Sequence, residues 1–188
     1  MRSTGFLLLL PMLFFILSCQ PTTPSNDDQK EELSPEQILD SLGIRLPQAS
    51  PPVANYVNAT MVPTGSGYIV FLAGKGPKKA DGTYILGKLG EDLSIEEGYE
   101  AARIAGINQL AALKAEIGEL SRVKRILKVR GMVNATPEFG DQPKVVNGFS
   151  DLMVAVFGEN GKHARAAVGM GSLPFNMAVE IEMVVAIE

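Results

Sequence analysis

The spacing of apolar and polar residues predicts three helices. Apolar residues fall mainly on one helical face over 95–117. Ser94 and Glu97 form a capping box in front of this segment, which is a common start signal for a helix. A further long helix is expected over 143–157, and a shorter, similarly capped one over 34–43. The chain is therefore expected to contain one short and two long helices.

Short segments rich in apolar residues predict five β-strands, at 54–62, 67–74, 123–133, 164–170 and 177–187. The resulting order of strands and helices is typical of an α+β domain with a mixed sheet and both long helices on one face. The strands are nearly continuous in apolar residues, so we expect the second face of the sheet to be buried as well. Oligomerisation is the simplest way to cover that face.

The amino terminus has a different pattern. After Arg2, an apolar run over 6–17 leads to Cys19, the only cysteine of the chain. The run is too short to span a bilayer comfortably, and "ILSC" resembles the bacterial lipobox. We interpret 1–18 as a lipoprotein signal peptide and 19–33 as a lipidated Cys19 followed by a flexible tether. The alternative is an exported cysteine without lipid.

This interpretation divides the chain into a signal peptide, a tether and one domain over 34–188. It predicts an exported lipoprotein, anchored to a membrane through lipid only, on the periplasmic or cell-surface side. With 188 residues and 46% hydrophobic residues, the chain is long enough for one domain with a sizeable core. The formal net charge of −4 does not favour nucleic acid, and the cations of "SRVKRILKVR" alternate with apolar residues as on the wet face of a strand.

Signatures of cofactor or metal chemistry are scarce in the sequence. A single Cys19 and a single His163 exclude a Cys/His catalytic pair and do not favour a metal cluster. The Gly-rich segments match neither a P-loop nor a dinucleotide fingerprint. We therefore predict no cofactor and no metal, and we interpret His163 as a surface residue.

One guanidinium within an apolar segment marks the candidate site. Arg165 lies in the run "ARAAVGMG", and Glu180 and Glu182 alternate along the last predicted strand. Arg165 could form a buried ion pair with one of these carboxylates. It could instead clamp a substrate carboxylate, with a nearby glutamate handling a proton or a water molecule. The residues alone favour the structural pair without excluding the clamp.

Several motifs, in order and at compatible spacing, resemble those of one family. They include "FLAGKGP", "DLSIEEGYEAARIAGINQLAALKAEIGEL", "QPKVVNGFSDL" and "HARAAVGMGSLP...VEIEMV". They are similar to the Rid family, also called YjgF-like or endoribonuclease L-PSP-like, and especially to its longer bacterial branch. The similarity spans about 43–187. It implies a chorismate-mutase-like fold and a homotrimer with a barrel-like core and ligand clefts between neighbouring subunits.

The resemblance also implies roles for particular residues. Arg165 matches the arginine that grips a substrate carboxylate, and Glu180 matches the glutamate that assists the attacking water. The carbonyl of Ala167 would help to hold that water, while Tyr56 and Asn147 would line the cleft. These positions favour the clamp over the structural pair.

One departure from the family pattern concerns Ala73, which stands where the family often supplies a serine hydroxyl. The resemblance implies an enamine or imine deaminase that hydrolyses reactive 2-imino and enamino acids to 2-keto acids and ammonia. The loss of the hydroxyl puts the substrate or the efficiency in doubt. The alternative is a trimeric lipoprotein that binds small carboxylates without turnover, and a ribonuclease ranks third because no basic groove supports it.

Overall fold

The computed structural model describes residues 33–188. The predicted signal peptide, Cys19 and almost all of the predicted tether lie outside the described residues. The helices are α1 (Pro35–Ser41), α2 (Ile95–Ile117) and α3 (Gln142–Phe157), and the strands are β1 (Ala59–Thr64), β2 (Gly67–Lys75), β3 (Val123–Asn134), β4 (Ala164–Met170) and β5 (Val179–Ile187). Three short 3₁₀ turns, η1 (Leu120–Arg122), η2 (Gly158–Gly161) and η3 (Pro174–Asn176), complete the structure.

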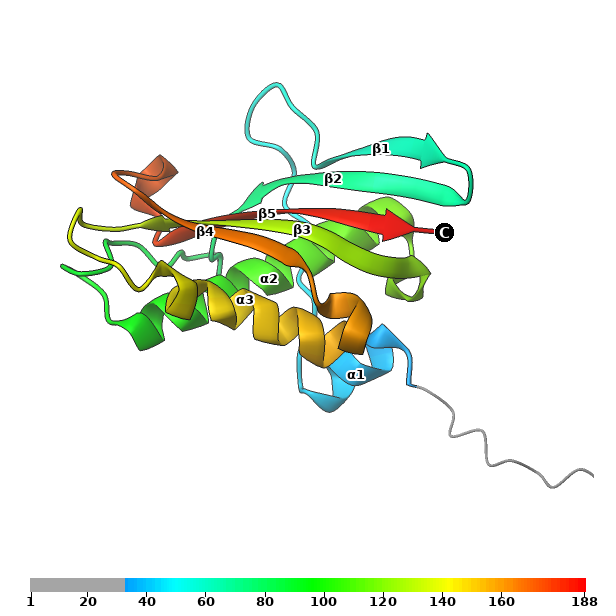
Figure 1. Cartoon of the computed structure of the whole chain (residues 1–188), viewed down its shortest axis with the longest axis horizontal. Helices are drawn as coiled ribbons and strands as arrows, with labels where there is room; N and C mark the ends of the chain where they lie inside the picture. Colours follow the sequence, from blue (N-terminus) through cyan, green and yellow to red (C-terminus); the bar gives the residue numbers. More distant parts are fainter. Residues whose placement is uncertain (1–32) are drawn as a thin grey trace, which may run out of the picture. The chain divides into compact units, whose positions relative to one another are not determined.

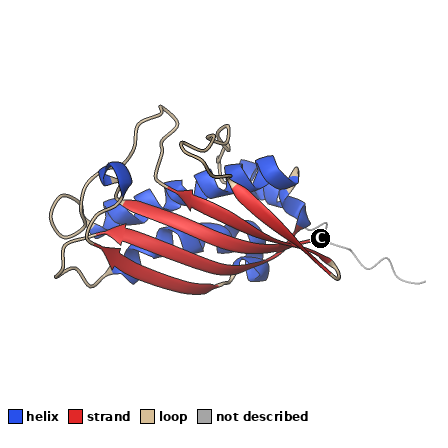
Figure 2. Cartoon of the chain, turned by 90° about the horizontal axis from the view of Figure 1, so that it is seen from above, coloured by secondary structure: helices blue, strands red, loops and turns tan. Residues whose placement is uncertain are grey.

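The five strands form one sheet in the order β1-β2-β5-β3-β4. All neighbours are antiparallel except β3 and β4, which are parallel and are connected through α3. The two long helices pack on the same face of this sheet (Figure 1), and Figure 2 shows the strands in front of them. The predicted α+β class, with a mixed sheet and two helices on one face, is confirmed.

One predicted strand begins later than the sequence indicated. The segment 54–58 is a loop, and β1 starts at Ala59. The side chain of Asn58 donates to the carbonyl of Ser50 at 3.0 Å and so folds this loop back on the preceding residues. Pro63 is tolerated in β1 because an edge strand leaves some of its N–H groups unpaired.

Side chains alternate strictly across β5. Its odd-numbered residues, from Val179 to Ile187, are buried against the helices, and its even-numbered residues are partly exposed. We call the face with the even-numbered residues the open face. It carries exposed apolar side chains, such as Val62 at 47% and Phe71 at 49%. The helices of a single chain cover only one face, so burial of the open face by oligomerisation stays a prediction.

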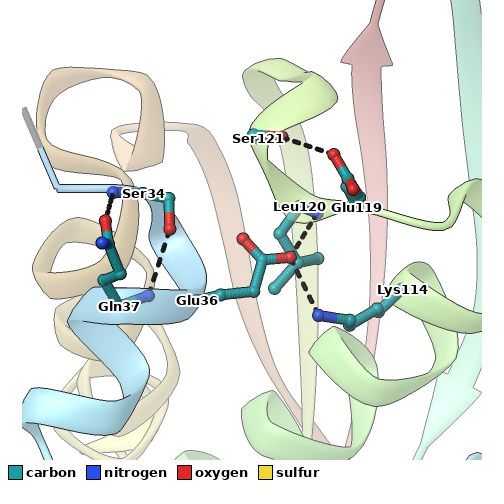
Figure 3. Close-up of polar contacts among 7 residues, drawn as sticks. All are labelled: Ser34, Glu36, Gln37, Lys114, Glu119, Leu120 and Ser121. Atoms are coloured by element: carbon teal, nitrogen blue, oxygen red, sulfur yellow. Dashed lines mark hydrogen bonds and ion pairs between the residues drawn. The ribbon is translucent and has the colours of Figure 1, made fainter.

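The short helix α1 is fixed against the end of α2 (Figure 3). Ser34 and Gln37 form the predicted capping box. The carboxylate of Glu36 accepts a hydrogen bond from the backbone N–H of Leu120 at 2.8 Å and pairs with Lys114 at 3.0 Å. These contacts attach the beginning of the described chain to the domain.

Within residues 33–188, no helix is both long and apolar enough to cross a membrane. Over the same range, no three acidic, histidine or cysteine side chains come together in a way that could hold a metal ion.

Candidate functional site

Arg165 lies on the edge strand β4 and points toward α3. In the sheet register it pairs with Val129, which is buried against the helices, so both side chains lie on the helix face. Its Nη1 donates to Asn147 Oδ1 at 2.9 Å and to Ser150 Oγ at 3.0 Å. Its Nη2 donates to the carbonyl of Pro143 at 3.4 Å. All three acceptors are neutral, so these contacts orient the guanidinium without cancelling its charge.

Within the described chain, Arg165 pairs with neither of the two glutamates. Glu182 forms an ion pair with Arg130 at 3.2 Å on the open face. Glu180 lies on the same open face, whereas Arg165 lies on the helix face. A single chain therefore offers the guanidinium neither of the two carboxylates that the sequence suggested.

His163 supports the group that holds Arg165. Its Nε2 lies 3.0 Å from Ser150 Oγ, and its Nδ1 lies 2.7 Å from the carbonyl of Gly161. Arg165 can only donate, so the hydroxyl oxygen of Ser150 accepts from it and the hydroxyl proton is free to point at Nε2. This arrangement assigns a neutral His163 ring with its proton on Nδ1. Burial lowers the pKa of His163, and the charge of Arg165 lowers it further. The hydrogen bond to Gly161 acts in the opposite direction and raises the pKa, but the net shift is downward. The prediction of a surface residue holds only in part, because the ring is half-buried.

Asn147 and Ala167 complete this group. A Cβ at Gly148 would lie 2.0 Å from the carbonyl oxygen of Tyr99, so only glycine allows α3 to pack this closely on α2. The close packing fixes the position of the adjacent Asn147. Ala167 lies two residues after Arg165 on the same face of β4 and packs against the core. We call Arg165, Asn147 and Ala167 the arginine corner.

The other predicted residues line a cavity of about 400 Å³. Glu180, Tyr56 and Ala73 contribute to its wall, together with Lys75 and Tyr84. We call this space the glutamate cavity. Tyr56 is 45% exposed and reaches it from the loop before β1, although the sequence had placed this residue in a strand.

Glu180 is half-buried beside a glycine. A Cβ on Gly74 would lie 2.0 Å from Glu180 Oε1, so the absence of a side chain at that position leaves room for the carboxylate. Burial raises the pKa of Glu180, the charge of Glu182 raises it further, and Lys75 opposes both effects. The carboxyl group is thus better suited to exchanging a proton than an ordinary surface glutamate.

A β-bulge shapes one wall of the cavity. The register between β2 and β5 shifts between Leu72 and Lys75. The fully buried Gln109 of α2 donates to the carbonyls of Ala73, at 2.9 Å, and Ile181, at 2.5 Å, on either side of the bulge. Sequence reasoning missed both Gln109 and Lys75. The available signal was a long amide in the middle of the apolar face of α2.

The arginine corner and the glutamate cavity lie on different parts of one chain. Arg165 is level with Met183 of β5, so Glu180 is three residues along the sheet and two strands away. At about 3.3 Å per residue and about 4.8 Å per strand, their Cα atoms are roughly 14 Å apart, and their side chains point to opposite faces. Within one chain, the two side chains therefore do not line a common site.

Comparison with known proteins identifies the family. The family model described as "YjgF/chorismate mutase-like, putative endoribonuclease" matches residues 36–186. Protein TCP17 of Trypanosoma cruzi is 43% identical over 148 residues, which are 78% of this chain and 90% of that protein. The chain belongs to the YjgF-like family, as the motifs predicted.

Two solved structures are similar in sequence and fold. The protein Atu1372 of Agrobacterium tumefaciens, whose function is unknown, is 41% identical with a TM-score of 0.74, over 82% of this chain and 92% of that one. A Shewanella oneidensis protein described as a "putative endoribonuclease" is 31% identical with a TM-score of 0.77, over 82% of this chain and all of the other. Because the relatives include a trypanosome protein as well as bacterial ones, the bacterial branch stays a prediction.

Proposed function

We propose that the protein is a Rid-like deaminase that hydrolyses 2-imino and enamino acids at clefts between the subunits of a homotrimer. The net reaction adds one water to the C=N bond and releases a 2-keto acid and ammonia. Membership of the YjgF-like family supports a Rid-like function in general. The separation of Arg165 and Glu180 within one chain supports a site shared between subunits.

The observation that carries the proposal is the state of Arg165. Its guanidinium is only partly exposed and is held by three neutral oxygen atoms, with no ion pair to a carboxylate among the described residues. An oriented planar cation of this kind is suited to bind a substrate carboxylate through two parallel hydrogen bonds. We infer that Arg165 fixes the substrate through its carboxylate.

Glu180 would supply the proton transfer in the proposed reaction. A carboxyl group with a raised pKa can take a proton from water as it attacks the imine carbon and return one to the leaving ammonia. Orientation of the substrate and the water is sufficient, because the imine carbon is already reactive. The carbonyl of Ala167 would help to hold the water.

The exposure of one aromatic residue favours the presence of a neighbouring subunit at this cavity. Phe175 lines the glutamate cavity, yet it is 80% exposed. Its φ of 55° lies in the left-handed region, which a bulky residue rarely adopts. In the proposed trimer the neighbouring subunit would cover this ring and bring its arginine corner to the cavity.

A second candidate function is binding without turnover. Ala73 gives the cavity wall a methyl group where the family often supplies a hydroxyl. A trimer that lacks this hydroxyl could hold small carboxylates through Arg165 and release them unchanged. The proposed lipid anchor at Cys19 fits this alternative, because enamines arise from cytoplasmic enzymes.

An imine-hydrolysis assay on the full-length chain separates these candidates. An amino-acid oxidase generates the 2-imino acid in the cuvette, and semicarbazide traps the part that has not been hydrolysed. We expect the wild type to reduce trapping and Arg165→Ala to abolish the effect. Arg103→Ala, which removes a partly exposed arginine of α2, is the matched control and should behave as the wild type.

Each outcome has a direct interpretation. Calorimetry with pyruvate should show binding to the wild type and weak binding to Arg165→Lys, which keeps the charge and loses the planar fork. Binding without hydrolysis would favour the second candidate. Neither binding nor hydrolysis, or equal hydrolysis by Arg165→Ala, would overturn the proposed role of Arg165.

A further inference from the structure

A lysine in the glutamate cavity has no part in the function proposed above. Lys75 is the last residue of β2, directly after the bulge, and it lines the cavity together with Glu180. Its Nζ donates to Asn58 Oδ1 at 2.6 Å. Among the described residues, no carboxylate forms an ion pair with it. Its side chain is therefore held in the cavity by a neutral partner.

The surroundings of Lys75 favour the neutral amine. The side chain is partly buried, and burial lowers the pKa of its ammonium group, against the opposing charges of Glu116 and Glu180. A larger fraction of Lys75 is therefore unprotonated at neutral pH than of an exposed lysine. An unprotonated amine carries the free electron pair that attacks a carbonyl carbon.

Several features fix this amine in place. Gln109 satisfies the two backbone carbonyls beside the bulge, which sets the position at which β2 enters the cavity. Asn58, which accepts from Lys75, is itself held by its bond to the carbonyl of Ser50. The cavity of about 400 Å³ has room for a small oxo acid between Lys75 and Glu180.

We propose that Lys75 is a nucleophilic amine that forms a Schiff base with small 2-oxo acids in the glutamate cavity. The electron pair of Nζ forms a bond to C2, and the carbonyl oxygen takes a proton from the Glu180 carboxyl group. The first Nζ proton is transferred to the resulting hydroxyl group, which leaves as water as the C=N bond forms, and the second Nζ proton returns to Glu180. One amine and one ketone give one imine and one water.

The same chemistry gives a covalent route for an imino acid. Attack of Nζ on its C2 displaces ammonia, and water then hydrolyses the Lys75 imine to the 2-oxo acid and the free lysine. This route rests on the proposed function. The adduct with a 2-oxo acid does not, because it forms from the amine and the ketone alone.

Reductive trapping tests the proposal on the full-length wild-type chain. The protein is incubated with pyruvate and cyanoborohydride, which reduces imines to stable secondary amines, and the modified lysines are located by peptide mass spectrometry. We expect Lys75 to be modified several-fold faster than the exposed Lys79, because the amine of Lys75 is held in the cavity by Asn58. Lys78, which also lines the cavity, provides an internal comparison.

Three variants complete the test. Lys75→Gln and Lys75→Arg should both lose the fast modification, although arginine keeps the positive charge. Lys79→Gln, which changes an exposed lysine in the following loop, should keep it. Circular dichroism establishes that each variant is folded, and the wild-type measurement stands without any variant.

The proposal would be overturned if Lys75 were unmodified, or if all three lysines were modified at similar rates. Its failure is distinguishable from failure of the proposed function. An adduct on Lys75 without imine hydrolysis would support the Schiff base and contradict the deaminase. Imine hydrolysis without any adduct would support the deaminase and contradict the Schiff base.

Discussion

Replacing Gln109 with leucine tests whether one buried amide holds the bulge that shapes the glutamate cavity. The wild-type amide donates to the carbonyls of Ala73 and Ile181, and the latter is buried. Leucine has a similar volume and no donor. The substitution therefore removes both of these hydrogen bonds while it preserves most of the packing of α2.

The expected loss of stability follows from these contacts. A buried polar group left without its partner costs about 1–3 kcal/mol, with the partly buried carbonyl of Ala73 at the low end. The change also removes Gln109 Oε1, a buried oxygen atom with no partner among the described residues. Removal of this unpaired atom offsets part of the destabilisation. We expect a net loss of about 1–3 kcal/mol in the free energy of unfolding.

Urea unfolding followed by circular dichroism, at one fixed protein concentration, measures this loss. In a thermal melt of a chain of this length, a loss of about 1 kcal/mol in the free energy of unfolding would lower Tm by roughly 2–4 °C. Gln109→Glu should be less stable than Gln109→Leu, because a buried carboxylate would face the two carbonyl oxygens. Glu100→Gln, at an exposed position of the same helix, is the control and should stay close to the wild type.

The reasoning would be refuted if Gln109→Leu were as stable as the wild type. A second readout concerns the cavity itself. If the bulge relaxes, Lys75 moves, and its reductive trapping with pyruvate should decrease in Gln109→Leu but not in Glu100→Gln. A destabilised variant with unchanged trapping would show that the amide supports the fold without positioning Lys75.

Three further predictions concern the rest of the molecule. His163 should titrate below its ordinary pKa of 6.5, so its contribution to stability is complete above about 6.5 and decreases as the pH falls toward the folded pKa; proton NMR can follow this single histidine, and an ordinary value would contradict the effects assigned to burial and to the charge of Arg165. Light scattering of a chain that begins at Leu33 should give three times the mass of one chain, because apolar side chains remain exposed on the open face; a monomer mass would reject the trimer. Cys19→Ser should release the protein from membranes in cell fractionation, and unchanged membrane association would reject lipidation as the anchor.

The sequence was sufficient for the elements and the fold class. Capping residues and apolar periodicity located the helices, because these signals act within a few residues of the chain. The strand 54–62 was the exception. Its apolar residues resemble a strand, but a hydrogen bond from Asn58 to Ser50 and a turn at Tyr56 make 54–58 a loop.

The tertiary structure alone decided how the candidate residues are grouped. The sequence suggested that Arg165 and Glu180 could meet, because both lie in the last two predicted strands. The sheet order places β3 between these strands, and the register turns the two side chains to opposite faces. Strand order and register depend on packing between distant segments, so no local pattern could reveal this separation.

Gln109 and Lys75 illustrate the same limit. A glutamine in a helix and a lysine at the end of a strand are unremarkable in a sequence, because their roles depend on a bulge between β2 and β5. The bulge forms where two strands from opposite ends of the domain pair over α2. The sequence by itself determined which residues carry charge and where the elements lie, and the pairing of distant strands decided which charges share a cavity.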